Sequence, residues 1–240
     1  MVFLTIFFSS LPLKAKVNYL LFLCGRRSTI PAAIVNAVKI EENGEEMVDI
    51  RQIPGIFLSE NLSARRNVYL RRGVAEKLGA VLKVLPQGVH LKIYSAFRSM
   101  DDQYQNWNRI YAQNRARYPD ADEVEITLKT KAKCADPRKG FGGHQTGGAI
   151  DLSLCDAVGN DLDMGTAYGK FNRCTPTACS DVSPSIKENR LLLLRAMQSV
   201  GFVNYPQEWW HYCYGDRMWA AYTQKNKCFY GLAAEPKEKE

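Results

Sequence analysis

Five glycines in the segment GFGGHQTGGAIDLSL (residues 140–154) constrain the fold more than any other part of the chain. Glycine adopts backbone conformations that other residues avoid, so residues 140–148 predict a flexible, tight turn. Residues 149–154 then alternate apolar and polar side chains, which predicts a strand with Asp151 on one face. The turn allows His144 to fold back beside Asp151, and we therefore expect a tight site where this strand begins.

A second segment, EWWHYCYGD (residues 208–216), places Glu208 and His211 three residues apart among large aromatic side chains. Two imidazoles and one carboxylate form a normal ligand set for catalytic zinc, with a fourth position left for water. His144, Asp151 and His211 are accordingly the predicted ligands of one zinc ion per chain. Glu208 is the predicted base that acts on the water. The alternative is aromatic packing around a hydrogen-bonded core histidine.

Arg98 follows the predicted strand VHLKIYSAF (residues 89–97). A hydrolase needs a positive group where the carbonyl oxygen of its substrate gains charge, and Arg98 is the candidate for that role. An ordinary salt bridge is an equally open interpretation. The chain has 3 histidines, and the remaining one, His90, lacks glycine or acidic neighbours and is interpreted as a plain strand residue.

Hydrophobic periodicity predicts an α+β fold. Apolar side chains recur at helical spacing before Pro86, and they are Val74, Leu78, Val81, Leu82 and Leu85. A second helix is expected over 99–115, and a third begins near Ser185 as N-cap and ends before Gly201. Residues 28–60, 116–143 and 155–184 read as mostly irregular, and strands are expected on either side of Pro206. Helices and short strands alternate without a parallel βαβ rhythm, so we predict a single domain with a central antiparallel sheet flanked by helices.

The ends of the chain read differently from its middle. Residues 1–27 are predicted to be a leader or signal segment, because a short apolar stretch there is flanked by basic residues. Residues 28–232 form the predicted catalytic domain, and residues 233–240 a disordered tail. No apolar run is long enough for a stable membrane span. We expect a periplasmic or otherwise exported protein, with a cytoplasmic location as the alternative.

Cysteine content supports export. The chain has 7 cysteines, and those beyond the leader are Cys134, Cys155, Cys174, Cys179, Cys213 and Cys228. An even number in the mature part fits three disulfides in an oxidising compartment. The suggested pairs are Cys174–Cys179, Cys213–Cys228 and Cys134–Cys155. The alternative is six reduced cysteines packed as small hydrophobic side chains.

Charge leaves the class of partner open, with a net charge of +7 and a pI near 9.0. An anionic cell-wall polymer, lipid or nucleic acid could bind such a chain. The densest basic cluster, residues 63–72, is interpreted as the solvated start of a helix, so no nucleic-acid partner is expected. The sequence carries no signal for an oligomeric state.

Three blocks carry a resemblance to a known family: GGHQTGGAIDLSL, LDMGTAYGKF and GFVNYPQEWWHYCYGDRMWA. In order and spacing they resemble the signatures of the zinc D-alanyl-D-alanine dipeptidases, over about residues 68–232. That family includes the vancomycin-resistance dipeptidases and belongs to a wider group of zinc peptidoglycan peptidases. The resemblance implies that His144, Asp151 and His211 bind zinc. It also implies that Glu208 is the general base and that Arg98 stabilises the tetrahedral intermediate.

Two departures from the family pattern concern substrate binding. The family usually has serine two residues before the first zinc histidine, where this chain has Gly142. The family block MGTxFD ends in an acid that helps to hold the ammonium of the substrate, and here Gly169 occupies that place. One of several aspartates could substitute, and the candidates are Asp156, Asp161, Asp163 and Asp181.

The preferred interpretation is a zinc dipeptidase acting on D-alanyl-D-alanine or a close D-amino-acid dipeptide. The first alternative is a zinc D,D- or L,D-carboxypeptidase that trims peptidoglycan stem peptides, because such an enzyme needs no contact to a free ammonium. The second alternative is a non-catalytic binding module that keeps zinc for structure. Glu208 and Arg98 argue against that module, since a structural site needs neither a base nor an oxyanion partner.

Overall fold

The structure is a computed structural model that describes residues 17–18, 21, 29–63 and 68–236. The predicted leader, with Cys24, lies almost entirely outside the described residues, as do residues 237–240 of the predicted tail. Among the described residues, no helix combines the length and apolar character needed to cross a membrane. The N- and C-terminal parts meet near β1 (Lys39–Ile40) and β9 (Lys227–Cys228), which pair in parallel.

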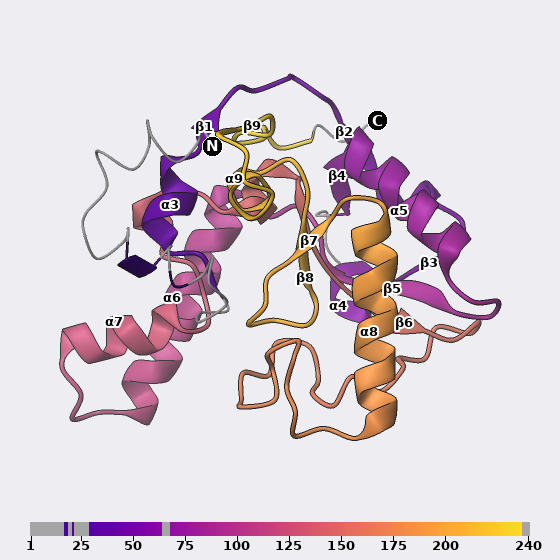
Figure 1. Cartoon of the computed structure of the whole chain (residues 1–240). Coiled ribbons are helices and arrows are strands. Elements are labelled where there is room, and N and C mark those ends of the chain that lie inside the picture. Colours follow the sequence, from indigo (N-terminus) through magenta and orange to yellow (C-terminus); the bar gives the residue numbers. More distant parts are fainter. Residues whose placement is uncertain (1–16, 19–20, 22–28, 64–67, 237–240) are drawn as a thin grey trace.

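A five-stranded sheet forms the centre of the molecule, in the order β3-β5-β6-β8-β7 (Figure 1). Its strands are β3 (Ile56–Leu58), β5 (His90–Ser95), β6 (Ala149–Cys155), β7 (Val203–Asn204) and β8 (His211–Cys213). All seven residues of β6 are buried, because β5 and β8 flank this strand and other elements cover both of its faces. The strands predicted over residues 89–97, over 149–154 and around Pro206 are confirmed.

The sheet is mixed, which corrects the prediction of a purely antiparallel one. β3 pairs in parallel with β5, whereas the other strand pairs of this sheet are antiparallel. Parallel neighbours need a long crossover. Here it is supplied by α4 (Glu60–Ser63), β4 (Tyr69–Arg71) and α5 (Arg72–Val84). Residues 28–60, expected to be irregular, therefore contribute an edge strand to the main sheet.

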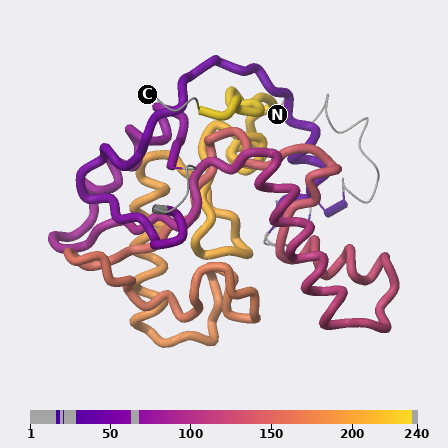
Figure 2. The backbone as a smooth tube through the Cα atoms, turned by 180° about the vertical axis from the view of Figure 1, so that it is seen from behind, coloured from indigo at the N-terminus to yellow at the C-terminus, as the bar shows by residue number. Residues whose placement is uncertain are grey.

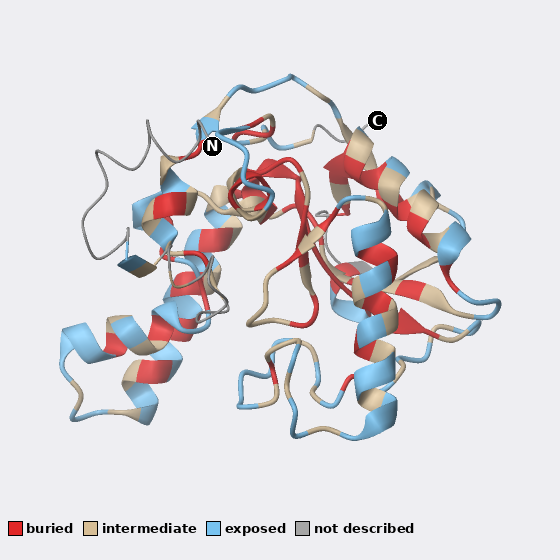
Figure 3. Ribbon diagram, in the orientation of Figure 1, coloured by how far each residue is buried: buried red, intermediate tan, exposed pale blue. Residues whose placement is uncertain are grey.

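Two helices cover one face of the sheet, α5 and α8 (Pro184–Ser199). Their inward side chains join Leu91, Ile93, Ile150, Leu152 and Leu154 in the main hydrophobic core, and Figure 3 shows burial concentrated on this sheet. The start of α8 is two residues earlier than predicted. Ser183 is its N-cap, because the Ser183 side chain accepts a hydrogen bond from the Ile186 amide and Pro184 occupies the first helical position.

A bulge gives the opposite face of the sheet its polar character. Ile93 pairs with Leu152 and Ser95 pairs with Asp151, so Tyr94 is an extra residue in β5. Without this bulge, Ser95 would point into the core, because side chains alternate along a strand. The extra residue places both Tyr94 and Ser95 on the face that carries Asp151.

The predicted helix over 99–115 is present as α6 (Met100–Arg117), and it is followed by an unpredicted helix, α7 (Glu123–Lys131). The two form an arm that stands away from the sheet (Figure 2). Asp122 caps α7, Ile126 is fully buried, and Thr130 accepts a hydrogen bond from the Asn114 amide. Apolar residues in α7 are two positions apart, a spacing that does not indicate a helix, and for this reason the helix was not predicted from the sequence.

Shorter elements close the domain around this frame. They are α3 (Ala32–Ala37), β2 (Met47–Asp49), the 3-10 helix η1 (Ile50–Gln52), the 3-10 helix η2 (Pro137–Lys139), the 3-10 helix η3 (Gly143–Thr146) and α9 (Arg217–Tyr222). α3 and α9 pack in a second hydrophobic cluster with Cys213 and Cys228. At the start of the predicted tail, the Ala233 amide donates a hydrogen bond to the Gln145 carbonyl.

The three predicted disulfides are not formed. The six cysteines beyond the leader all lie among the described residues and are free thiols. Cys213 and Cys228 share one cluster, yet their sulfur atoms contact the backbone carbonyls of Val203 and Tyr230 instead of each other. Cys134 packs against side chains of α6. Buried cysteines here act as small hydrophobic residues, and export remains a prediction.

The core should depend on α5 much more than on the outer face of α8. Leu78 is fully buried, so Leu78→Ala should lower the free energy of unfolding by about 2–5 kcal/mol through lost contacts and a residual cavity. Leu191→Ala, on an α8 side chain that is 41% exposed, is the matched control and should change it by less than about 0.5 kcal/mol. Urea unfolding followed by circular dichroism measures both. Equal effects would contradict this core.

Candidate metal centre

A row of three residues across the sheet defines the site. Asp151 on β6 pairs directly with His211 on β8, and on its other side with Ser95 on β5. Residues that oppose each other in antiparallel strands have Cβ atoms about 4.5–5.5 Å apart and share one face. The register of three strands therefore brings together side chains that are up to 116 positions apart in the sequence.

His144 joins this row from η3, the turn before β6. Gly143 allows the approach, because a Cβ atom there would lie 2.2 Å from Asp216 Oδ2 and 2.7 Å from Ala149 Cβ. The His144 carbonyl accepts a hydrogen bond from the Arg98 amide, so the turn is tied to the end of β5. The glycine-rich segment thus forms the tight turn predicted from the sequence.

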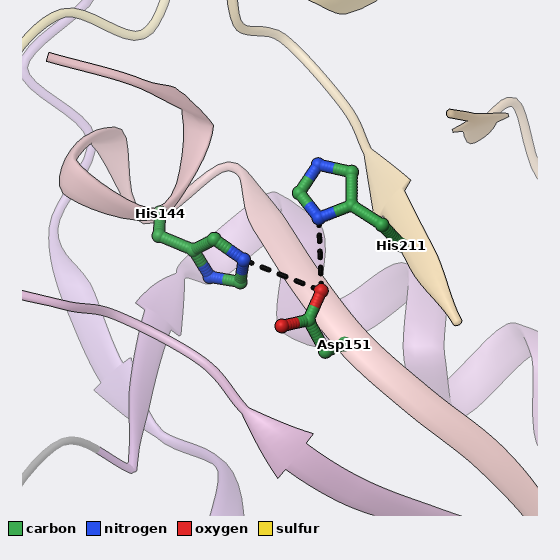
Figure 4. A group of neighbouring side chains, drawn as sticks. All are labelled: His144, Asp151 and His211. Carbon is green, nitrogen blue, oxygen red and sulfur yellow. Dashed lines mark hydrogen bonds and ion pairs between the residues drawn. The ribbon is translucent and has the colours of Figure 1, made fainter. Parts of the chain in front are cut away.

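The two predicted histidine ligands converge on one carboxylate oxygen of the third ligand, Asp151 (Figure 4). His144 Nε2 lies 3.3 Å from Asp151 Oδ1, and His211 Nδ1 lies 2.8 Å from the same atom. The ligand atoms of this group all lie within 4.8 Å of one another. Two imidazole nitrogens and one carboxylate oxygen at this separation can hold a divalent metal ion.

The tautomer of His144 is set by the backbone. His144 Nδ1 lies 2.7 Å from the carbonyl oxygen of Ala96, and only a protonated nitrogen can donate to a carbonyl. The Nε2 atom therefore presents its lone pair to the site. A backbone acceptor of this kind is a usual second partner of a histidine that binds metal.

Burial and mutual charge shift the pKa values of the group in different directions. Burial alone would raise the pKa of Asp151, but both histidines outweigh it, and the pKa falls far below its usual value. The pKa of His144 is lowered, chiefly by burial. Burial acts in the same direction on His211, yet the hydrogen bond and the charge of Asp151 prevail and raise its pKa. Asp151 thus stays ionised in the interior and attracts positive charge.

Glu208 lies beside this group. Burial raises its pKa, and the charge of Asp151 adds to that rise, while His211, Trp210 and Arg98 oppose it. Trp210 makes a side-chain hydrogen bond to Glu208, and the backbone amide of His211 donates to the Glu208 carbonyl. The carboxylate predicted to be the base is therefore partly buried and oriented by its own loop.

Arg98 reaches the same site with neutral partners. Its Nη1 atom donates to Gln103 Oε1 at 3.0 Å, and its Nη2 atom donates to Ser95 Oγ at 3.1 Å. Both partners lie in the part of the chain that the structure describes, and neither carries a charge. The salt-bridge interpretation of Arg98 is thus not supported. Gln103, which sequence reasoning missed, holds the guanidinium from α6.

Aromatic side chains wall the site. Trp209 and Trp210 are 2% exposed, and the Trp209 indole donates to Thr166 Oγ1 at 2.8 Å. The Tyr168 hydroxyl donates to Asp151 Oδ2 at 3.0 Å, and burial together with the charge of Asp151 raises the pKa of Tyr168 well above its usual value. The sequence analysis singled out the tryptophans, whereas Tyr168 lay within the block LDMGTAYGKF without an assigned role.

His90 lies on β5, where its ring packs edge-on against Phe57, as expected for a strand residue outside the ligand group. Four aspartates were candidates for holding a substrate ammonium, and each has a partner in the structure. Asp156 and Asp163 accept from backbone amides of their own turns, Asp161 binds Lys92 and Tyr94, and Asp181 pairs with Arg173. A Cβ atom at Gly169 would meet nothing within 4 Å.

A large groove of about 1260 Å³ lies elsewhere, between β2, α5 and residues 233–236. None of the five predicted site residues lines it. Chemistry requires groups that bind or transfer charge, and those converge at Asp151. We therefore place the functional site at the His144, Asp151 and His211 group and not in this groove.

Comparison with known proteins agrees with the resemblance noted above. The model of the Peptidase_M15 family, described as D-ala-D-ala dipeptidase, matches residues 59–231. The D-alanyl-D-alanine dipeptidase of Escherichia coli (strain K12) is 32% identical over 126 residues, which are 52% of this chain and 55% of that protein. The protein of the same name from Synechocystis sp. is 35% identical over 95 residues, which are 35% of this chain and 38% of that protein.

The chain spans about half the length of the curated relatives it matches. Among solved structures, the vancomycin-resistance D,D-pentapeptidase VanY in complex with Zn(II) aligns with a TM-score of 0.46 and 16% identity. That alignment covers 81% of this chain and 96% of the VanY chain.

The ligand group should bind about one divalent metal ion per chain. His144→Ala and His211→Ala should each lose most of the bound metal, because two remaining ligands hold such an ion poorly. His90→Ala, which removes the third histidine, should retain it. Elemental analysis after dialysis measures all three. Full metal content in both ligand variants would show that the ion is held elsewhere.

Proposed function

This chain belongs to the Peptidase_M15 family of D-Ala-D-Ala dipeptidases, and we propose that it is a zinc-dependent peptidase. The proposed substrate is the dipeptide D-alanyl-D-alanine or a close D-amino-acid dipeptide. The observation that carries this proposal is the convergence of His144, Asp151 and His211 with Glu208 three residues from one ligand. A base so close to a metal group is a requirement of hydrolysis and not of structure.

The donor set fits zinc. Zinc accepts imidazole nitrogen and carboxylate oxygen, and three protein ligands leave one position for water or substrate. The Ala96 carbonyl already fixes the tautomer that His144 needs. When bound, zinc would lower the pKa of a coordinated water to about 7 and polarise the carbonyl of the scissile bond.

The remaining steps belong to side chains of this chain. Glu208 accepts a proton from the attacking water and returns it to the departing amine. Arg98 donates to the carbonyl oxygen as that oxygen gains negative charge, since its hydrogen-bond partners Gln103 and Ser95 are both neutral. Trp209 and Trp210 exclude bulk water, which strengthens these interactions.

A second candidate function is the removal of the terminal residue from a longer stem peptide. Gly142 and Gly169 offer no side chain to a substrate ammonium, and the four aspartates that could replace them are engaged elsewhere. A longer peptide has an amide at that place and needs no anionic partner. This candidate shares the metal group, the base and Arg98 with the first.

Base and ligand roles can be separated by substitution. Glu208→Gln should keep zinc and the fold but lose several orders of magnitude in kcat, because an amide cannot accept the proton. Arg98→Ala should keep zinc and lose about 10²–10³-fold in kcat, as expected for an oxyanion donor. Turnover of D-Ala-D-Ala and zinc content should be measured on the same preparations. Near wild-type kcat in either variant refutes the role assigned to that residue.

The amino end of the substrate distinguishes the two candidates. If no acidic side chain holds the ammonium, N-acetyl-D-Ala-D-Ala should be hydrolysed with a kcat/KM within about tenfold of that of the free dipeptide, since the lost interaction is worth less than about 1.4 kcal/mol. Release of D-alanine from the free dipeptide, the acetylated dipeptide and a pentapeptide stem provides the comparison. A preference for the free dipeptide of several orders of magnitude would exclude the longer substrate.

A further inference from the structure

The carboxylate of Asp151 has two differently occupied oxygens. Oδ1 faces both histidines, at 3.3 Å from His144 and 2.8 Å from His211. Oδ2 accepts a hydrogen bond from the hydroxyl group of Tyr168, with 3.0 Å between the two oxygen atoms. Only Oδ1 is thus directed toward the space between the two imidazoles.

The ring of Tyr168 is fixed by its aromatic neighbours. It stacks on Tyr94 with 4.6 Å between ring centroids and 11° between ring planes. Trp210 meets it edge-on, with centroids 5.5 Å apart and planes at 77°. One neighbour comes from the bulge of β5 and the other from the loop of Glu208. Contacts on two sides set the direction of the hydroxyl group.

The segment that carries Tyr168 is anchored on both sides of it. The buried guanidinium of Arg190, on α8, donates to the carbonyls of Met164, Cys174 and Pro176. These carbonyls lie before and after Tyr168 in the chain. The phenol is therefore delivered to Asp151 by a braced loop, although the loop has no regular secondary structure over residues 162–183.

We infer that Tyr168 is a positioning residue that keeps Asp151 Oδ2 occupied, so that Asp151 offers the metal one oxygen. The inference rests on the proposed metal-dependent function. A carboxylate that offered both oxygens would also fill the position needed by water or substrate, because a catalytic zinc site keeps that position open. Partners of this kind orient the ligands and tune the affinity of a metal site.

The substitution Tyr168→Phe tests this role, because it keeps the ring between Tyr94 and Trp210 and removes the hydroxyl alone. The dissociation constant for zinc, measured by competition with a chromophoric chelator, should rise about 10–100-fold. Cobalt(II) in place of zinc reports the coordination number directly. Its visible absorption should weaken in the variant, because a four-coordinate site would gain a fifth donor atom from Asp151. Circular dichroism should show an unchanged fold.

Tyr94→Phe is the matched control. It removes a neighbouring hydroxyl, which binds Asp161 and not Asp151, and should leave zinc affinity and the cobalt spectrum unchanged. Wild-type affinity and spectrum in Tyr168→Phe would overturn the inference while leaving the proposed function intact. Equal losses in both variants would also overturn it, because the loss would then not depend on the hydrogen bond to Asp151 Oδ2. Failure of the unmodified protein to bind zinc would refute the proposed function itself.

Discussion

The pairing of Asp151 with His211 across two antiparallel strands is the constraint on which the rest of the structure depends. A carboxylate buried to 4% exposure is stable only if its charge is matched by hydrogen bonds or by positive charge. The register of β6 against β8 supplies one imidazole, and the glycine-rich turn before β6 supplies the other. A shift of one residue would turn Asp151 into the hydrophobic core, and the packing of α5 and α8 against that core prevents this shift.

Two carboxylates and one guanidinium lie close together at this site. Asp151 is buried, Glu208 is partly buried, and the hydrogen-bond partners of Arg98 are neutral. Burying such groups is costly unless an ion or a substrate later compensates them. A divalent cation beside Asp151 would offset that cost on one side, and the negative oxygen of a reacting carbonyl would offset it at Arg98. The charges of Asp151, Glu208 and Arg98 are thus consistent with the proposed hydrolysis.

The sequence predicted the features that are local. His144 and Asp151 lie within one turn and the strand that follows it, and Glu208 and His211 within one loop and the strand that follows it. Short motifs were therefore sufficient to find them. Residues that act across the fold were missed: Tyr168 and Gln103 reach the site from other elements, and no local pattern marks a hydroxyl or amide as a partner of a distant ligand. The bulge at Tyr94 and the parallel edge strand β3 were missed because both depend on pairing between strands. The predicted disulfide pairs were wrong for a related reason, because an even number of cysteines does not show which of them lie close together in the fold.

Anomalous diffraction at the zinc edge from crystals of the zinc-loaded protein tests the central claim most directly. The account predicts a single strong peak per chain, bounded by His144 Nε2, Asp151 Oδ1 and His211 Nδ1. It also predicts that Glu208 lies beside the peak without contributing a bond to it. A peak held by cysteine sulfur atoms, or no peak between the two histidines, would contradict the account.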